Sequence, residues 1–178
     1  ALAAAATGGR LIERAQKKNI PFIRIPATGI QPRSALGFQT RALLKLMGDE
    51  SGLAETQKLS KLLDIEKTEK QGKALAKKLA RKIPVIYASA RNKTLSHIWK
   101  IKFNENAKIP SFCNTFPELN HNEMTGFDVT KSARPLAERF HFIFLRDEED
   151  GPNILKRMDE TAKLFKKMKF RVEMLSIA

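Results

Sequence analysis

The polar residues best suited to chemistry lie between residues 103 and 126. Glu105 stands there between Asn104 and Asn106. A carboxylate with amide neighbours, once partly desolvated, can take a proton from a carbon next to a carbonyl. The structural alternative is an exposed helical glutamate that pairs with Lys108, a contact worth about 0.3 kcal/mol. The residues alone favour this alternative, so Glu105 as a general base is a hypothesis.

His121 is a second candidate for acid–base chemistry. It follows Pro117 by four residues, and we expect it in the first turn of a short helix. The positive end of the helix dipole disfavours a cation there, which favours neutral imidazole. A histidine hydrogen-bonded to a neighbouring asparagine is an equally good explanation. Glu118 directly follows Pro117, where a helix start favours a carboxylate, so its expected role is structural.

Another candidate group lies near the beginning of the chain. Pro32 suits the first helical position, which places Arg33 in the first turn, where a cation is disfavoured by roughly 0.3 to 1 kcal/mol. Such a cation suits an anionic ligand or a developing enolate oxygen; the alternative is an exposed arginine paired with a distant carboxylate. Thr7, Gly8 and Gly9 precede a predicted helix. They could approach a phosphate, although a tight turn explains them more simply.

The other reactive side chains are interpreted as structural. His97 stands beside Trp99 on an amphipathic helix, His141 opens a buried strand, and Cys113 lies mid-strand as a small core residue. The sequence has neither a CxxC pair nor an HExxH helix, so we predict no metal site. A single cysteine excludes an internal disulfide and indicates a cytoplasmic protein.

Alternating strands and helices must position these residues. Strands are predicted at residues 22–25, 84–88, 111–115, 141–145 and 171–177. Helices are predicted at residues 10–18, 33–47, 66–82, 93–106, 118–124 and 153–169. The runs VIYAS and FIFL are apolar at consecutive positions, which indicates a parallel sheet covered by helices on both faces. The sequence therefore predicts a doubly wound α/β fold.

The predicted elements divide the chain in two. From residue 84 onward, four strands with their crossovers make nearly one complete unit. The first fifty residues do not fit inside it, and the break GDESG at residues 48–52 is interpreted as a linker. We therefore expect the end of a preceding domain and the linker at residues 1–50, and a second domain at residues 51–178.

The net charge of +14 is compatible with nucleic acid, an acidic membrane surface or small phosphorylated ligands. The densest basic run, residues 66–82, places Leu75 and Leu79 on one apolar face, as a solvated amphipathic helix would. Only 7% of residues are aromatic, and most lie inside apolar runs, so nucleic-acid binding ranks last. The apolar run at residues 1–6 is too short to span a bilayer, so no membrane association is expected.

Four segments together resemble one known family, the bifunctional phosphoglucose/phosphomannose isomerases, which are built from two sugar isomerase (SIS) domains. The segments are FNENAK, FPELNHNEMTGF, IPATGIQPRSALGF and FIFLRDEEDGPNILKRMDET. The resemblance implies a flavodoxin-like, three-layer αβα fold, with one nearly complete SIS domain after the end of another. It also implies an interconversion of glucose 6-phosphate and fructose 6-phosphate through an ene-diol, with mannose 6-phosphate as a further candidate substrate.

The resemblance assigns a role to each candidate residue. Glu105 is the base that moves the proton between C1 and C2, His121 assists ring opening, and Arg33 stabilises the ene-diolate. The expected substrate-binding residues are Asn104, Thr7, Gly8 and Gly9.

The resemblance also implies a homodimer with shared active sites, in which the histidine comes from the partner subunit. It implies neither a metal nor a redox cofactor. The family's serine/threonine phosphate loop is expected upstream of Ala1, and a further lysine is expected after Ala178. The alternative is a non-catalytic SIS module that binds phosphosugars for regulation.

Overall fold

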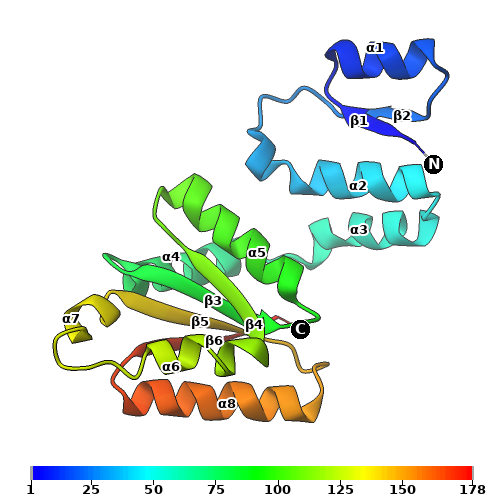
Figure 1. The fold of residues 1–178 in the computed structure, drawn as a ribbon. Coiled ribbons are helices and arrows are strands. Elements are labelled where there is room, and N and C mark those ends of the chain that lie inside the picture. The colour runs from blue at the N-terminus through cyan, green and yellow to red at the C-terminus, as the bar shows by residue number, and fades with distance from the viewer. Residues whose placement is uncertain (1, 178) are drawn as a thin grey trace. The chain divides into compact units, whose positions relative to one another are not determined.

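The computed structural model describes residues 2–177, which form two compact units (Figure 1). The first unit is Ala1–Gly72 and the second is Lys73–Ala178. The division falls inside the helix α4 (Ile65–Leu79). This division reflects how densely residues contact one another and does not locate a boundary between SIS domains. The expected boundary after residue 50 therefore stays a prediction.

The second unit is built on a four-stranded parallel sheet. Its strands are β3 (Ile83–Ser89), β4 (Phe112–Phe116), β5 (Phe140–Arg146) and β6 (Arg171–Ser176). They lie in the order β4-β3-β5-β6. Each predicted strand is present with ends shifted by one residue at most. β3 and β5 are buried along most of their length because helices cover both faces, as their unbroken apolar runs predict.

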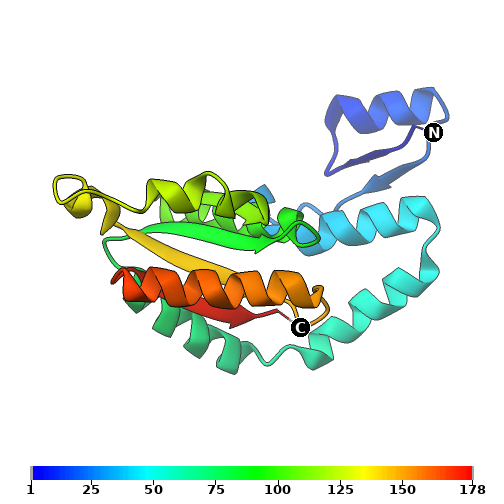
Figure 2. The same cartoon turned by 60° about the horizontal axis from the view of Figure 1, so that its bottom comes forward.

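Helices form the two outer layers of this unit (Figures 1 and 2). One face carries α6 (Glu123–Gly126) and α8 (Pro152–Lys167), and the other carries α4 and α5 (Lys93–Lys102). A four-residue helix, α7 (Arg134–Ala137), precedes β5. The predicted three-layer α/β fold is therefore confirmed.

Successive residues of one strand supply the two cores. On the α8 face, the rings of Phe142 and Phe165 have centroids 4.4 Å apart, and both side chains are fully buried. On the α4 and α5 face, Ile143 and Leu145 are fully buried. Burial of each such side chain contributes roughly 1.5 to 3 kcal/mol, so this sheet is a rigid base for the loops at its edges.

The first unit contains a smaller parallel pair of strands. β1 (Ala4–Ala6) and β2 (Phe22–Arg24) are joined by α1 (Gly9–Lys17). A 3-10 turn, η1 (Pro32–Ser34), then leads to α2 (Leu36–Met47) and α3 (Glu50–Leu62). No strand is predicted at β1 because alanines carry little strand propensity, so pairing with β2 decides the structure.

The linker interpretation of residues 48–52 is wrong. Gly48 ends α2 in the left-handed conformation, with φ of +72°. Asp49 begins α3 by accepting a hydrogen bond at Oδ1 from the backbone N–H of Gly52, 2.8 Å away. The break is therefore a tight turn between two helices, a glycine C-cap followed at once by an aspartate N-cap.

Candidate active site

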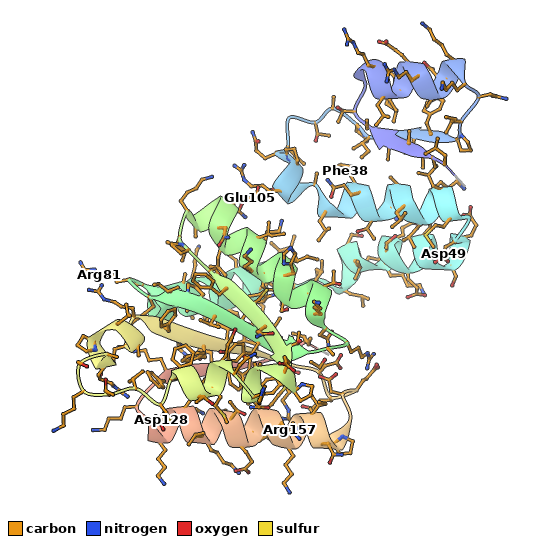
Figure 3. The ribbon with its side chains drawn as sticks, viewed as in Figure 1. Phe38, Asp49, Arg81, Glu105, Asp128 and Arg157 are labelled. Atoms are coloured by element: carbon orange, nitrogen blue, oxygen red, sulfur yellow. The ribbon has the colours of Figure 1, made fainter. Side chains whose placement is uncertain are left out.

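Glu105 lies on a widened turn at the end of α5. The predicted helix does continue past residue 102, but as a π-helical turn, η2 (Phe103–Ala107). The half-buried Phe103 packs against the core cluster of the α5 face, whereas Asn104 and Glu105 are exposed. Figure 3 shows Glu105 at this end of the helix. Single π-helical turns inside α-helices are frequent at functional sites.

The alternative role of Glu105 as a partner of Lys108 is not realised. The structure shows no ion pair between these two described residues. Lys108 itself ends the π-helical turn in the left-handed conformation, with φ of +57°. Glu105 is therefore an exposed carboxylate on a turn that Phe103 anchors to the core.

His121 follows β4, between two short helical turns. η3 (Glu118–Asn120) comes directly after Pro117, and the backbone N–H of His121 donates to the Glu118 carbonyl at 2.9 Å. α6 begins only at Glu123, and the His121 side chain is exposed. The expected place in the first turn of a helix is wrong, because the predicted helix 118–124 is split in two. A three-residue turn has no sizeable dipole, so the electrostatic argument for a neutral imidazole does not apply.

Glu105 and His121 lie at opposite edges of the sheet: Glu105 is at the edge formed by the amino ends of the strands, and His121 is at the edge formed by their carboxyl ends. Because α5 runs antiparallel to β3, the chain returns to the amino edge at Glu105 before it enters β4, and it reaches the carboxyl edge again before His121. The five residues of β4 span about 16 Å. His121 therefore lies at the carboxyl edge and Glu105 at the amino edge. One chain does not bring the two side chains together.

Side-chain contacts bridge the crevice where doubly wound sheets usually bind their ligands. In doubly wound folds this crevice lies where successive connections leave to opposite faces, here between the carboxyl ends of β3 and β5. Asn92 Nδ2 donates to Asp147 Oδ2 at 2.9 Å, and Arg91 pairs with Glu149. The hydrogen bond from Asn92 holds the pKa of the Asp147 carboxyl below its ordinary value. These contacts were missed from the sequence, because they join segments more than fifty residues apart.

Arg33 belongs to the first unit. It is the half-buried middle residue of η1, after Pro32 as predicted. The predicted helix 33–47 instead begins at Leu36, after this separate 3-10 turn. Arg33 is therefore not in the first turn of a long helix, and the unfavourable dipole that motivated a ligand there is weaker than expected.

Thr7 and Gly8 connect β1 to α1, and Gly9 is the first residue of α1. Gly9 has φ of +72°, in the left-handed region that favours glycine. No side chain caps the start of α1, and a Cβ at Gly8 or Gly9 would meet nothing within 4 Å. The turn thus leaves open space beside the first amides of the helix, which suits both a simple turn and a phosphate contact.

Two further features of the described residues bear on function. Residues 2–177 contain no group of three or more His, Cys, Asp or Glu side chains that could hold a metal ion. In the same part of the chain, no helix is both long and apolar enough to cross a membrane.

Comparison with known proteins identifies a family model that covers the whole of the second unit. The model describes the bacterial phospho-glucose isomerase C-terminal SIS domain and matches residues 68–178. A solved structure of a protein from Salmonella typhimurium LT2 aligns with a TM-score of 0.51 at 16% identity, over 99% of this chain and 62% of that one. This last similarity concerns the fold alone.

Curated relatives match most of the chain. The bifunctional phosphoglucose/phosphomannose isomerase of Caldicellulosiruptor bescii is 38% identical over 90% of this chain and 50% of its own length. The enzyme of the same name from Aquifex aeolicus is 31% identical over 89% of this chain and 48% of its own. The D-glucosamine-6-phosphate 4-epimerase of Sulfolobus acidocaldarius is 28% identical over 66% and 39%, respectively. The chain spans about half the length of the two isomerases.

Proposed function

Because the chain belongs to the family of the bacterial phosphoglucose isomerase C-terminal SIS domain, a sugar-phosphate isomerase family, we propose that it contributes to an aldose–ketose isomerase. The substrates are glucose 6-phosphate and fructose 6-phosphate, with mannose 6-phosphate as a further one. The observation that carries the proposal is Glu105, an exposed carboxylate within the FNENAK motif on an anchored π-helical turn.

The reaction needs three chemical groups. A histidine opens the sugar ring, a carboxylate takes the proton from C2 of the open aldose and returns it to C1, and a cation stabilises the ene-diolate between the two steps. His121, Glu105 and Arg33 take these roles in turn. Asn104 and the turn of Thr7, Gly8 and Gly9 bind the substrate, and the open space beside Gly8 and Gly9 is compatible with a phosphate. The reaction requires neither a metal nor a redox cofactor.

The site is shared between two subunits of a homodimer. Glu105 and His121 of one chain lie at opposite edges of its sheet, too far apart to act on the same sugar. Glu105 therefore works with His121 of the partner subunit. Residues 1–50 end a first SIS domain and residues 51–178 belong to a second one. A cytoplasmic location, as the single cysteine indicates, fits the use of free sugar phosphates.

A coupled isomerase assay on the full-length protein tests this function. Glucose 6-phosphate, mannose 6-phosphate and glucosamine 6-phosphate are compared, and binding of each is measured separately. We expect Glu105→Gln to lower kcat by orders of magnitude with little change in phosphosugar affinity, because the amide cannot accept the proton. Glu118→Gln is the matched control, since Glu118 is an exposed carboxylate whose Oε1 accepts a long hydrogen bond from Asn122 Nδ2, at 3.4 Å.

The assay also separates the alternatives. Binding of phosphosugars without turnover by the wild type would favour the non-catalytic SIS module. Conversion of glucosamine 6-phosphate alone would favour an epimerase, as in the Sulfolobus acidocaldarius relative. Near wild-type kcat in Glu105→Gln would remove Glu105 from the mechanism.

A further inference from the structure

The segment that carries His121 has little local stability of its own. η3 has three residues and α6 has four, and no side chain caps the start of either. Helical turns this short do not persist alone in water. Contacts with the rest of the unit must therefore fix where His121 lies.

One carboxylate in this segment is held by two strands at once. Glu123 Oε2 accepts from the Tyr87 hydroxyl at 2.7 Å, and Glu123 Oε1 accepts from Asn114 Nδ2 at 2.9 Å. Tyr87 on β3 and Asn114 on β4 are partners in the strand register, so their side chains leave the same face of the sheet. Both oxygens of Glu123 are thus tied to neighbouring points on the rigid part of the molecule.

Both donors are themselves fixed. Asn114 Oδ1 accepts from the backbone N–H of Thr115 at 2.8 Å, which orients the amide so that its Nδ2 faces Glu123. Tyr87 is fully buried, and its ring contacts those of Phe116 and Phe144 at centroid distances of 6.1 and 5.5 Å. Burial, together with the hydrogen bond to Glu123, raises the pKa of the Tyr87 hydroxyl, so it remains a donor throughout the neutral range.

A second contact holds the other side of the segment. Asn120 Nδ2 donates to Thr161 Oγ1 on α8 at 2.8 Å, and Leu119 is fully buried beside it. His121 and Asn122 are the two residues between the contacts of Asn120 and Glu123. The backbone of His121 is therefore held from both directions, while its side chain stays exposed.

We propose that Glu123 is a positioning residue for His121, acting through its hydrogen bonds to Tyr87 and Asn114. The proposal rests on the isomerase function proposed above, in which His121 assists ring opening. An imidazole must lie within hydrogen-bond reach of the ring oxygen to exchange a proton with it, and a displacement of about 1 Å can cost up to about 100-fold in rate. The two strands thus set the place of the ring-opening group.

The test uses Tyr87→Phe in the full-length protein with glucose 6-phosphate that carries deuterium at C2. We expect kcat/KM to fall by up to about 100-fold. We also expect the deuterium isotope effect on kcat/KM to shrink towards one. Ring opening breaks no bond to the C2 hydrogen, so once it becomes the slower step the isotope no longer matters. Loss of folded protein alone would lower the rate and leave the isotope effect unchanged.

The matched control is Val85→Ala, which removes buried apolar volume from the same strand and the same core without touching Glu123. Glu123→Gln serves as a second variant, because one of the two accepting oxygens becomes an NH2 group, which cannot accept from the donor that faces it. The third readout is the imidazole proton resonance of His121, one of three histidines in the chain. We expect it to shift in Tyr87→Phe and Glu123→Gln, while the resonance of His97 stays unchanged.

The outcomes separate this proposal from the proposed function. An isotope effect and a His121 resonance that match those of Val85→Ala in both variants would overturn the positioning role. A wild type without isomerase turnover would instead overturn the function. The His121 resonance would still report whether Glu123 fixes the segment.

Discussion

At the scale of single residues, His141 is a buried titratable group on β5, where this strand pairs with β6. It lies on β5 with 1% of its side chain exposed, and neither ring nitrogen has a hydrogen-bond partner among the described residues. Glu173 Oε1 is 3.7 Å from Nε2, and Glu173 Oε2 accepts from Lys78 on α4 at 2.6 Å. Burial lowers the pKa of His141; Glu173 and the backbone of Lys78 oppose this shift, whereas the charges of Arg171 and Lys78 add to it.

This environment predicts a loss of stability towards acid. The folded state favours neutral imidazole, so the unfolded chain binds the proton more readily. The contribution is complete above the ordinary histidine pKa of about 6.5 and is lost as the pH falls through the lowered pKa of folded His141. Thermal unfolding between pH 7.5 and about pH 5.5 should show a falling Tm, and His141→Leu should flatten this slope. His97→Gln, at an exposed histidine, is the control, and equal slopes in wild type and His141→Leu would refute the assignment.

At the scale of elements, the turn between α2 and α3 depends on the Asp49 side chain and on its close approach to Gly52. A Cβ on Gly52 would lie 2.6 Å from Asp49 Oδ2 and 2.9 Å from a methyl carbon of Leu44, so the cap needs a glycine there. Removing the cap with Asp49→Ala should cost about 1 kcal/mol. Hydrogen exchange of the first amides of α3 should then speed up by about fivefold, because 1.4 kcal/mol corresponds to a factor of ten.

A second N-cap provides the control for this prediction. Asp64 Oδ1 accepts from the backbone N–H of Lys67 at 2.9 Å in the first turn of α4. Asp64→Ala should speed exchange there and leave the amides of α3 unchanged. If Asp49→Ala alters both helices equally, the effect is a general loss of stability and not a local cap.

The strands of the sheet and the turn between α2 and α3 illustrate what the sequence can and cannot predict. The strands of the four-stranded sheet were predictable because runs such as residues 85–88 are apolar at every position, as a strand covered on both faces requires. A glycine C-cap followed by an aspartate N-cap has the same composition as a linker, so GDESG was misinterpreted. Only the hydrogen bond between Asp49 and Gly52 distinguishes the two.

The candidate site was predictable in its motifs but not in its geometry. Glu105 and His121 are only sixteen residues apart, which suggested one cluster. The antiparallel course of α5 separates them, and no local pattern records that direction. Glu123 reads as an ordinary helix-start carboxylate in the sequence, because its partners Tyr87 and Asn114 come from other strands.

At the scale of the whole molecule, the separation of Glu105 from His121 predicts complementation between inactive subunits. Glu105→Gln and His121→Ala should each be inactive alone in the full-length protein. After subunit exchange, a mixed dimer has one site that combines the intact glutamate of one chain with the intact histidine of the other, and one site that lacks both. Random pairing makes half of the dimers mixed, so recovery should approach about one quarter of wild-type activity.

Two measurements make this result decisive. Mass spectrometry of differently tagged chains establishes that exchange has occurred, and a mixture of Glu105→Gln with Glu105→Ala is the control, because no pairing of these chains restores a glutamate. Recovery only in the first mixture requires a site built from two subunits. Complete exchange without recovery would mean that each chain closes its own site, which would require Glu105 and His121 to meet despite the strand of about 16 Å between them.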